Sequence, residues 1–274
     1  PPAIVLWHGL GDRYNSDGMA HVAELVARLL PGTYVHSIYV DETPALDERR
    51  SLFGDANRAV DLVCAQLSNI TELSLGFGAI GFSQGGLFLR ALIQRCPSIA
   101  VSKLVTFGSP HMGVLELPVC QPPDDWVCRK RNQLLKAQVW QDSVQKTVVP
   151  AQYFRDPGQY ERYLEHSNFL AAVNNERPSE GSRAAKRRFE RLQKLVLIKF
   201  AHDSTLVPKE SAFFQERHGL TGQEVPMTGT RVYRDNLFGL RTLHEAGRIE
   251  FHTVDDEHMQ FSDDFFLKIV SDHF

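Results

Sequence analysis

The chain of 274 residues is 43% hydrophobic and 23% charged, which is ordinary for a globular protein with one large domain or two small ones. Its formal net charge of −3, with the histidines neutral, gives no electrostatic basis for nucleic-acid binding. No apolar run approaches the roughly 18 residues that a membrane-spanning helix needs, so none is predicted.

Strand and helix patterns alternate along the first 107 residues. Ala3 to Trp7 is apolar on both faces, as expected for a buried parallel strand, and residues 19–30 carry apolar side chains at helical spacing. The next expected elements are a strand over residues 33–40, a helix over 53–67, a strand ending at Phe82, a helix from Gly86 to just before Pro97, and a strand over 103–107. This alternation predicts an α/β fold with a mostly parallel central sheet and helices on both faces.

The alternation then stops and resumes only near residue 195. Residues 112–191 are irregular, mostly helical in pattern, and contain scattered aromatic side chains. We interpret them as a cap inserted over the catalytic end of the sheet, within a single domain that spans residues 1–274. The remaining expected elements are strands over 195–200 and 248–254 and a closing helix that carries Phe265, Phe266, Ile269 and Val270.

A Gly-x-Ser-x-Gly motif, Gly81-Phe82-Ser83-Gln84-Gly85, lies between an expected strand and the helix that follows it. In such a turn the serine adopts a strained, exposed conformation, and glycines flank it because side chains there would clash with the packed strand and helix. The Ser83 hydroxyl would then project from the end of the sheet, where a base and a substrate can reach it. The motif in this context predicts that Ser83 is a nucleophile.

A serine nucleophile needs a histidine to accept its proton and a carboxylate to orient that histidine. In open parallel sheets such groups gather at the carboxyl ends of the strands, and α/β-hydrolases use the chain order serine, acid, histidine. Asp203 directly follows the strand that ends near Phe200, and His258 lies just past the strand that ends near Val254. We therefore expect Asp203 and His258 to complete a catalytic triad with Ser83.

Other acids and histidines also follow the late strands. The competing acids are Asp235, Asp255 and Asp256, and the competing histidines are His202, His244 and His252. His252 lies inside its strand, and Asp255 and Asp256 are too close along the chain to His258 to approach it from the opposite side. Asp235 follows a weaker strand candidate over residues 230–233 and remains the main alternative. His8, beside the first strand, is expected to be a supporting hydrogen-bonding residue.

The oxyanion that forms during acyl transfer needs preorganised N–H donors, each worth about 2.7–4 kcal/mol. The backbone N–H of Gln84, directly after the nucleophile, is the first expected donor. The second is expected in the loop after the first strand, where His8-Gly9-Leu10-Gly11 places glycines on both sides of Leu10. We expect the Leu10 N–H to complete the oxyanion hole.

The four cysteines, Cys64, Cys96, Cys120 and Cys128, show neither a Cys-x-x-Cys pair nor a zinc-type histidine spacing. If oxidised they allow three pairings, and a Cys120–Cys128 bond would stabilise its short Pro-rich loop by about 2–3 kcal/mol. Asn69-Ile70-Thr71 is a glycosylation sequon. Together with a start at Pro1, directly on an expected core strand, these features favour a secreted or luminal protein from which a signal segment has been removed.

With these residues placed, the chain resembles the lysosomal palmitoyl-protein thioesterases, in their protein-depalmitoylating branch, over essentially its whole length. The resemblance rests on an ordered series of motifs, which is far more specific than the serine motif alone. The motifs are Trp7-His8-Gly9-Leu10-Gly11-Asp12, Gly81-Phe82-Ser83-Gln84-Gly85-Gly86 with Phe88-Leu89-Arg90, Gln94-Arg95-Cys96-Pro97-Ser98, Leu117-Pro118-x-Cys120, Phe169-Leu170 with Asn174-x-Glu176-Arg177, and Lys199-Phe200-x-x-Asp203-Ser204. A departure is Asp256-Glu257-His258, where the family usually has Gly-Asp-His.

The resemblance implies an α/β-hydrolase fold that removes long fatty acyl groups from cysteine thioesters, without a cofactor or metal. It implies residence in the lysosome or vacuole, or secretion, and N-glycosylation, for which Asn69 is the available site. By motif match it assigns the triad to Ser83, Asp203 and His258, the oxyanion donors to Leu10 and Gln84, and the disulfides to Cys64–Cys96 and Cys120–Cys128.

The implied partners are S-acylated proteins or peptides and fatty acyl thioesters. A 16-carbon chain needs a long apolar groove, because each buried methylene contributes about 0.8 kcal/mol. The candidates for its lining are Phe154, Phe169, Leu170, Leu206 and Val207. Two alternatives stay open: a lipase or carboxylesterase that acts on oxygen esters with the same triad, and a catalytically silent hydrolase-fold binding protein, against which the intact triad argues.

A basic run on an expected helix consists of Arg183, Lys186, Arg187, Arg188 and Arg191. The simplest interpretation is a solvated helix face. Protonation of the eleven histidines in an acidic lumen would make the formal charge positive, which favours transient contact with anionic membranes that carry the lipidated substrate.

Overall fold

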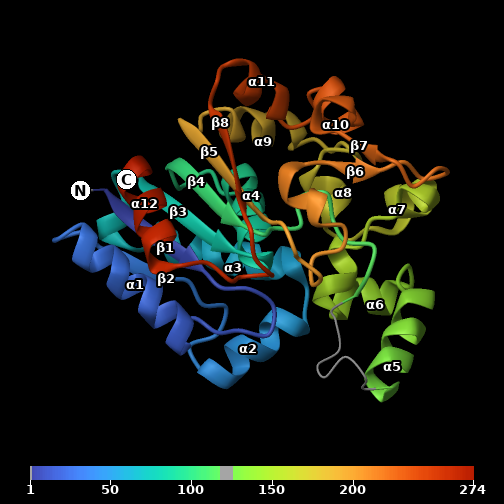
Figure 1. Ribbon diagram of the computed structural model, residues 1–274, viewed down its shortest axis with the longest axis horizontal. Coiled ribbons are helices and arrows are strands. Elements are labelled where there is room, and N and C mark those ends of the chain that lie inside the picture. Colours follow the sequence, from blue (N-terminus) through green and yellow to red (C-terminus); the bar gives the residue numbers. More distant parts are fainter. Residues whose placement is uncertain (1, 118–125) are drawn as a thin grey trace.

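The computed structural model describes residues 2–117 and 126–274 and shows a central parallel sheet with helices on both faces (Figure 1). The strand order is β2-β1-β3-β4-β5-β8, and each neighbouring pair is parallel. The strands are β1 (Ala3–Trp7), β2 (Val35–Ser37), β3 (Phe77–Phe82), β4 (Val101–Phe107), β5 (Lys194–Phe200) and β8 (Ile249–Val254). The predicted α/β fold class is confirmed.

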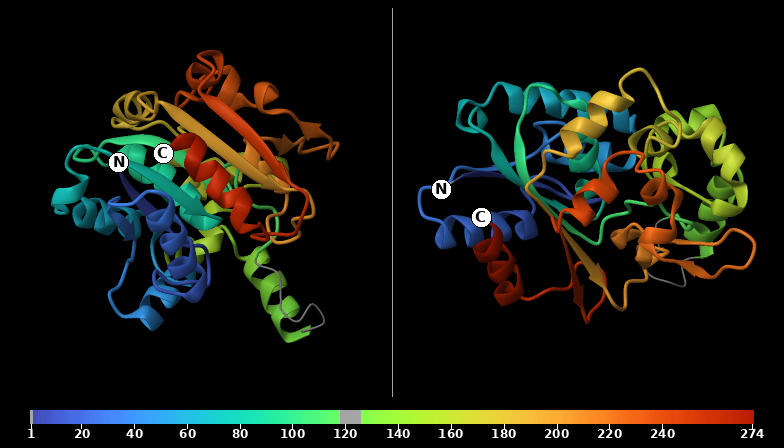
Figure 2. Two further views of the ribbon diagram at one scale, coloured as in Figure 1. Left: turned by 60° about the vertical axis from the view of Figure 1, so that its left-hand side comes forward. Right: turned by 90° about the horizontal axis from the view of Figure 1, so that it is seen from above.

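Two separate apolar clusters cover the two faces of the sheet. On one face α1 (Asp17–Leu29) and α12 (Asp263–His273) lie side by side and bury residues such as Val22 and Phe266 against the strands. On the other face α4 (Gln84–Arg95) packs on the sheet, and α3 (Ala56–Ser68) and α9 (Ser182–Phe189) both pack on α4. The right-hand view of Figure 2 shows this three-layer arrangement from above.

The bounds of one helix and one strand differ clearly from the sequence prediction. α1 begins two residues earlier than expected because the Ser16 hydroxyl accepts a hydrogen bond from the Met19 N–H. The edge strand β2 keeps only three of the eight residues expected over 33–40. Its short length is common for a strand at a sheet edge.

The predicted strand over residues 230–233 is wrong, because this segment forms the short helix α10 (Arg231–Arg234). Its backbone groups are satisfied locally, since the Arg234 N–H donates to the Thr230 carbonyl and the Asp235 N–H to the Arg231 carbonyl. Val232 and Tyr233 are buried together against neighbouring segments. The β-branched residues that suggested a strand are therefore core residues of a helical turn.

Shorter elements complete the described chain. Before β5 these are α2 (Pro44–Leu52), α5 (Trp126–Ala137), α6 (Asp142–Thr147), α7 (Tyr160–His166), α8 (Leu170–Val173) and the 3₁₀ turns Thr71–Leu73, Val149–Tyr153 and Pro157–Gln159. After β5 they are the two-residue strands β6 (Glu216–Arg217) and β7 (Glu224–Val225), α11 (Leu240–Glu245) and the 3₁₀ turns Lys209–Phe213 and Met227–Gly229. Among the described helices, none combines the length and apolar character needed to cross a bilayer.

The segment between β4 and β5 is largely helical, as expected, and lies to one side of the sheet (Figure 1). Its last helix, α9, packs on α4, where Arg188 Nε donates to the Gln94 carbonyl at 2.7 Å. This part of the segment therefore covers a face of the sheet, while α5 to α8 lie beyond the carboxyl edge of the strands.

A buried ion pair fixes the helical segment internally. Arg155 donates to both carboxylate oxygens of Glu176, at 2.8 and 3.2 Å, and both side chains are at most 2% exposed. Tyr160 and Tyr163 donate to the same carboxylate at 3.0 and 2.6 Å. Arg155 also binds Glu216, which joins the segment to β6. Both buried carboxylate oxygens of Glu176 thus accept hydrogen bonds.

Arg90 on α4 ties this network to the sheet. Its guanidinium is completely buried and donates to Asn174 Oδ1 at 2.7 Å and to the His111 carbonyl at 3.0 Å. Asn174 in turn donates to Glu176. Burial lowers the pKa of Arg90 to about 9, which still leaves its guanidinium charged at neutral and acidic pH. The helix that starts at Ser83 is therefore linked to the inserted segment by charge-assisted hydrogen bonds.

The structure contains a Cys64–Cys96 disulfide, which joins α3 to the end of α4. The two residues are 32 positions apart in the sequence, so the bond closes a long loop of the unfolded chain. The expected Cys120–Cys128 bond lies outside the described residues. Asn69, the sequon residue, is exposed at the end of α3, and its glycosylation stays a prediction.

Glu176→Gln should destabilise the fold by up to about 3–5 kcal/mol, because it removes the carboxylate that is buried with Arg155 and leaves that charge only its second partner, Glu216. Burial would raise the pKa of Glu176, but the Arg155 charge and hydrogen bonds outweigh burial and lower it. A lowered folded-state pKa stabilises the protein above the unfolded pKa of about 4.3, and this stabilisation is lost as the pH falls through the folded pKa. Urea unfolding at several pH values should therefore show a difference between the two proteins that shrinks below about pH 4.

Asp142→Asn is the matched control, because Asp142 forms an exposed pair with Lys146 on the same segment. It should change the free energy of unfolding little at any pH. Equal losses for the two variants, or a loss for Glu176→Gln that grows on acidification, would contradict the assigned role of the buried pair.

Candidate active site

Ser83 occupies a sharp turn between β3 and α4. Its backbone has φ 51° and ψ −121°, a conformation that is rare for a residue with a side chain. A Cβ on Gly81 would lie 2.4 Å from the Gly86 Cα, and one on Gly85 would lie 2.2 Å from the Trp7 carbonyl oxygen. The Ser83 N–H donates to the Phe107 carbonyl at 2.7 Å. Close packing of strand and helix thus holds the serine in the turn.

Ser83, His258 and Asp203 form one continuous hydrogen-bonded chain. His258 Nε2 lies 3.0 Å from Ser83 Oγ, and His258 Nδ1 lies 2.6 Å from Asp203 Oδ2. The Asp203 side chain is 1% exposed and that of His258 13%. A histidine held between a hydroxyl and a buried carboxylate can accept the hydroxyl proton and carry the resulting positive charge.

The loops after β5 and β8 position the acid and the base. Asp203 Oδ1 accepts hydrogen bonds from the Thr205 and Leu206 N–H groups, at 2.9 and 2.8 Å. This leaves Oδ2 facing the imidazole. The His202 N–H donates to the Asp256 carbonyl at 3.0 Å, which ties the Asp203 loop directly to the His258 loop. Both loops are therefore fixed against each other as well as to their strands.

The competing residues lie elsewhere and have other partners. Asp235 pairs with Arg231 at 3.3 Å, and Asp255 pairs with His202 at 2.8 Å on the surface. His244 contacts the Tyr233 hydroxyl at 2.7 Å. His252 contacts Glu250 at 2.7 Å, and Asp256 Oδ1 accepts from the Glu257 N–H.

The two expected oxyanion donors flank the serine. Gln84 is the first residue of α4, so its N–H belongs to the first helical turn, where N–H groups have no partner within the helix. The loop that contains Gly9 and Leu10 lies so close to Ser83 that a Cβ on Gly9 would be 3.2 Å from the Ser83 Cβ. Leu10 and Ser83 line the same cavity.

A buried pair that sequence reasoning did not find supports this loop. Asp47, on α2, is fully buried and lies 3.0 Å from His8 Nε2. Its carboxylate also accepts from the Val40 and Tyr14 N–H groups, at 2.7 and 2.9 Å. Burial would raise the pKa of Asp47, but the His8 contact and these hydrogen bonds outweigh burial and lower it. The expected supporting role of His8 agrees with this contact, whereas Asp47 was missed because the polar helix α2 was missed.

The Gln84 side chain is a second unpredicted support. Its amide nitrogen donates to the Ser51 carbonyl at 3.0 Å, and its amide oxygen accepts from the Tyr153 hydroxyl at 2.9 Å. Ser51 Oγ accepts from the Gly11 N–H at 2.8 Å. These bonds join α4, α2 and the Leu10 loop around the start of the nucleophile helix, and they hold both expected donors in place.

A cavity of about 510 Å³ opens at Ser83 and His258. Its walls come from α1, the Asp203 loop, the inserted segment and the chain between His258 and α12. Most lining side chains are apolar, among them Met19, Val22, Phe82, Val114, Pro150, Leu206, Met259 and Phe261. Its size and apolar lining suit a small hydrophobic ligand.

Only one of the five predicted groove residues, Leu206, lines this cavity. Phe154 packs edge-on against Trp140 and Phe169 against Phe88, and both are at most 1% exposed in the core. Leu170 is also fully buried in that core, and Val207 is not part of the cavity wall. Phe154 and Phe169 therefore serve core packing, and these four residues of the predicted lining lie outside the wall of this cavity.

Comparisons with known proteins point to one family. Residues 3–258 match the family profile described as palmitoyl protein thioesterase. The chain is 39% identical to palmitoyl-protein thioesterase 1 of Caenorhabditis elegans, over 94% of this chain and 86% of that protein. It is 30% identical to palmitoyl-protein thioesterase 3 of Dictyostelium discoideum, over 93% and 84%. It is 28% identical to the lysosomal thioesterase PPT2 of Bos taurus, over 90% and 77%.

Asp47→Asn should lower kcat for a chromogenic acyl ester by about 10- to 100-fold with little change in KM, because a displaced oxyanion donor acts on the transition state. Glu48→Gln is the control, since Glu48, next to Asp47 on α2, forms only a surface pair with Arg13. It should leave kcat within about twofold of the original value. A rise in KM with unchanged kcat, or an equal fall in kcat in both variants, would contradict a role of Asp47 in positioning the Leu10 loop.

Proposed function

Because the chain belongs to the palmitoyl protein thioesterase family, we propose that it hydrolyses long-chain fatty acyl thioesters of cysteine through an acyl-serine intermediate. The observation that carries this proposal is the hydrogen-bonded chain Ser83–His258–Asp203 at the mouth of a largely apolar cavity. The substrates are S-acylated proteins or peptides and other fatty acyl thioesters. Its expected site of action is the lysosome, on the analogy of the lysosomal relatives.

In the first step the Ser83 Oγ attacks the thioester carbonyl carbon while His258 Nε2 takes the hydroxyl proton. The carbonyl π electrons move onto oxygen, and the Leu10 and Gln84 N–H groups stabilise the negative charge. Asp203 keeps the Nδ1 proton of His258 in place and stabilises the imidazolium that forms. The short 2.6 Å contact and the burial of Asp203 suit this task.

In the second step the tetrahedral intermediate collapses, the carbon–sulfur bond breaks, and the fatty acyl group stays on Ser83. The leaving thiolate takes the proton from His258 and departs as the cysteine thiol. Because a thiol has a pKa near about 8.5, the sulfur leaves with little assistance, unlike an amide nitrogen.

Water then enters and gives up a proton to His258 as its oxygen attacks the acyl-serine carbonyl. A second tetrahedral intermediate forms in the same oxyanion hole and collapses, with the imidazolium proton returning to Ser83 Oγ. The products are a free fatty acid and the original enzyme. The partial exposure of His258, compared with buried Asp203, leaves it reachable by this water.

We assign acyl binding to the cavity beside α1 and α12. Burial of each methylene contributes about 0.8 kcal/mol, so the acyl chain would dominate recognition. The helices α5 to α8 and their connections, within the predicted cap of residues 112–191, would cover the catalytic end, and Val114, Pro150 and Tyr153 from this region already form part of the cavity wall.

The basic run on α9 lies away from this site. Arg188 contacts the carbonyl of Gln94, at the end of α4 opposite Ser83. Contact of this run with anionic membranes stays a prediction, and it would leave the cavity mouth free.

Ser83→Ala and His258→Gln should lower kcat for palmitoyl thioester by at least about 10⁴-fold, and Asp203→Asn by about 10⁴-fold. Asp235→Asn, the control for the competing acid, should retain full activity. Matched palmitoyl thioester and oxygen-ester substrates of equal leaving-group acidity identify the preferred bond. Full activity of Asp203→Asn contradicts the triad, and exclusive oxygen-ester turnover contradicts the thioesterase assignment.

Val22→Phe should shorten the usable groove, because Val22 lies on α1 and lines the cavity. Exclusion of about two methylenes, or roughly 1.6 kcal/mol, predicts a drop of about 15-fold in kcat/KM for a 16-carbon substrate, with little change for an 8-carbon one. Ala20→Phe is the control on an exposed position of the same helix. Equal losses for both chain lengths would contradict this placement of the acyl chain.

A further inference from the structure

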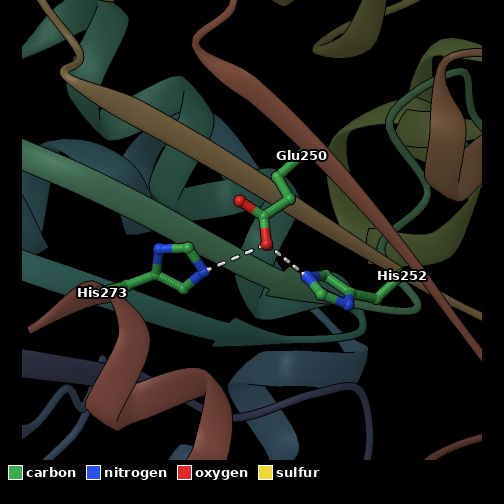
Figure 3. Close-up of side chains that lie close together, drawn as sticks. All are labelled: Glu250, His252 and His273. Carbon is green, nitrogen blue, oxygen red and sulfur yellow. Dashed lines mark hydrogen bonds and ion pairs between the residues drawn. The ribbon is translucent and has the colours of Figure 1, made fainter.

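Two histidines and a glutamate converge where the edge strand β8 meets the C-terminal helix α12 (Figure 3). His252 Nε2 lies 2.7 Å and His273 Nε2 3.5 Å from the same oxygen, Glu250 Oε1. One ligand-type atom from each of the three residues lies within 4.8 Å of the others. This cluster plays no part in the mechanism above, since Glu250 and His252 lie on β8 before the loop that carries His258, and His273 lies on α12 after it.

The His273 nitrogen has a geometry that ordinary hydrogen bonding does not explain. The residue is 8% exposed, and its Nε2 is buried without a hydrogen-bond partner. A separation of 3.5 Å from Glu250 is too long for a good hydrogen bond. A buried imidazole nitrogen that faces a carboxylate oxygen without a hydrogen bond to it is free to act as a metal ligand.

We propose that Glu250, His252 and His273 bind a divalent transition metal of the zinc type. Two imidazole nitrogens and a carboxylate oxygen are a ligand set that zinc commonly uses, with a fourth position open to water. Tetrahedral ligands about 2.0–2.2 Å from a zinc ion lie roughly 3.4 Å from one another. The His273–Glu250 separation already fits, and His252 must retreat from Glu250 by under about 1 Å. The two imidazole nitrogens, which lie within 4.8 Å of each other, must also approach by up to about 1.4 Å, which the partial exposure of His252 permits.

The position of the site points to a structural role. Glu250 and His252 lie on β8, His273 lies near the end of α12, and the His258 loop connects these two elements. A bound ion would therefore fasten the edge strand to the closing helix on both sides of the catalytic loop. No atom of the cluster belongs to the triad, so the ion would stabilise the fold without entering the reaction.

The charged groups around the cluster moderate the expected affinity. Lys194 binds the other Glu250 oxygen, Oε2, at 3.0 Å, and thereby competes with a bound cation. The Lys103 ammonium contacts the His273 carbonyl, and Asp272 pairs with Lys268 on α12. Lys194 leaves Oε1 for the metal but reduces the negative charge available to it.

Binding of Co²⁺ and Zn²⁺ to the full chain, freed of metal by a chelator, tests the proposal. Co²⁺ should give visible absorption typical of a site with nitrogen and oxygen ligands, and Zn²⁺ at about 100 times its Kd should raise the Tm by about 5–10 °C. His252→Gln and His273→Gln should each weaken binding at least about tenfold. His202→Gln, which alters a histidine paired with Asp255 outside the cluster, should bind as the original protein does.

Lys194→Gln should tighten binding of both ions, since it removes the competing charge and leaves all three ligands in place. The absence of a Co²⁺ spectrum, equal Zn²⁺ effects in the His202 and His273 variants, or unchanged affinity in Lys194→Gln would overturn the proposal. Thioester hydrolysis should persist in the metal-free protein, so a failure here is distinguishable from a failure of the proposed function.

Discussion

The left-handed backbone at Ser83 is the constraint on which the rest of the site depends. A non-glycine residue in such a conformation costs about 1–3 kcal/mol, and it persists only where its surroundings leave no alternative. Here β3 and α4 approach so closely that Gly81 packs on Gly86 and Gly85 packs on the Trp7 carbonyl. A relaxed backbone at Ser83 would separate strand from helix and open the core behind them. Core packing therefore maintains the geometry that chemistry needs.

The order of the strands brings the acid and the histidine to the turn that carries Ser83. β3, β4, β5 and β8 are consecutive neighbours in the sheet, although β3 and β8 are far apart in the sequence. Since all four strands are parallel, Ser83, Asp203 and His258 emerge at one edge. Backbone hydrogen bonds between the Asp203 and His258 loops then fix the two loops relative to each other. The pairing of the parallel strands, set by apolar burial on both faces of the sheet, thus brings Ser83, His258 and Asp203 within hydrogen-bonding distance.

The sequence predicted the site residues that directly follow a strand. It did not predict those whose role depends on tertiary packing. Ser83, Asp203 and His258 were found because parallel strands expose the residues that follow them. The cavity wall was largely missed, because aromatic residues such as Phe154 and Phe169 suit a lipid groove and a core equally well. Asp47 was missed for a different reason: α2 has few apolar residues, so its sequence shows no apolar periodicity that would predict a helix. Its importance lies in contacts with His8 and with the Val40 and Tyr14 N–H groups, which only the tertiary structure creates.

Several residues that carried the family resemblance have structural duties rather than chemical ones. Arg90 lies far in sequence from Asn174 and Glu176, yet the three form one buried network that joins α4 to the inserted segment. A buried arginine is tolerable only when its charge is matched, so each member of the network requires the others. Loss of one would loosen the segment whose residues Val114 and Tyr153 complete the cavity wall. The network thus positions a segment that forms part of the cavity wall, which gives these motifs, remote from the triad, a structural reason.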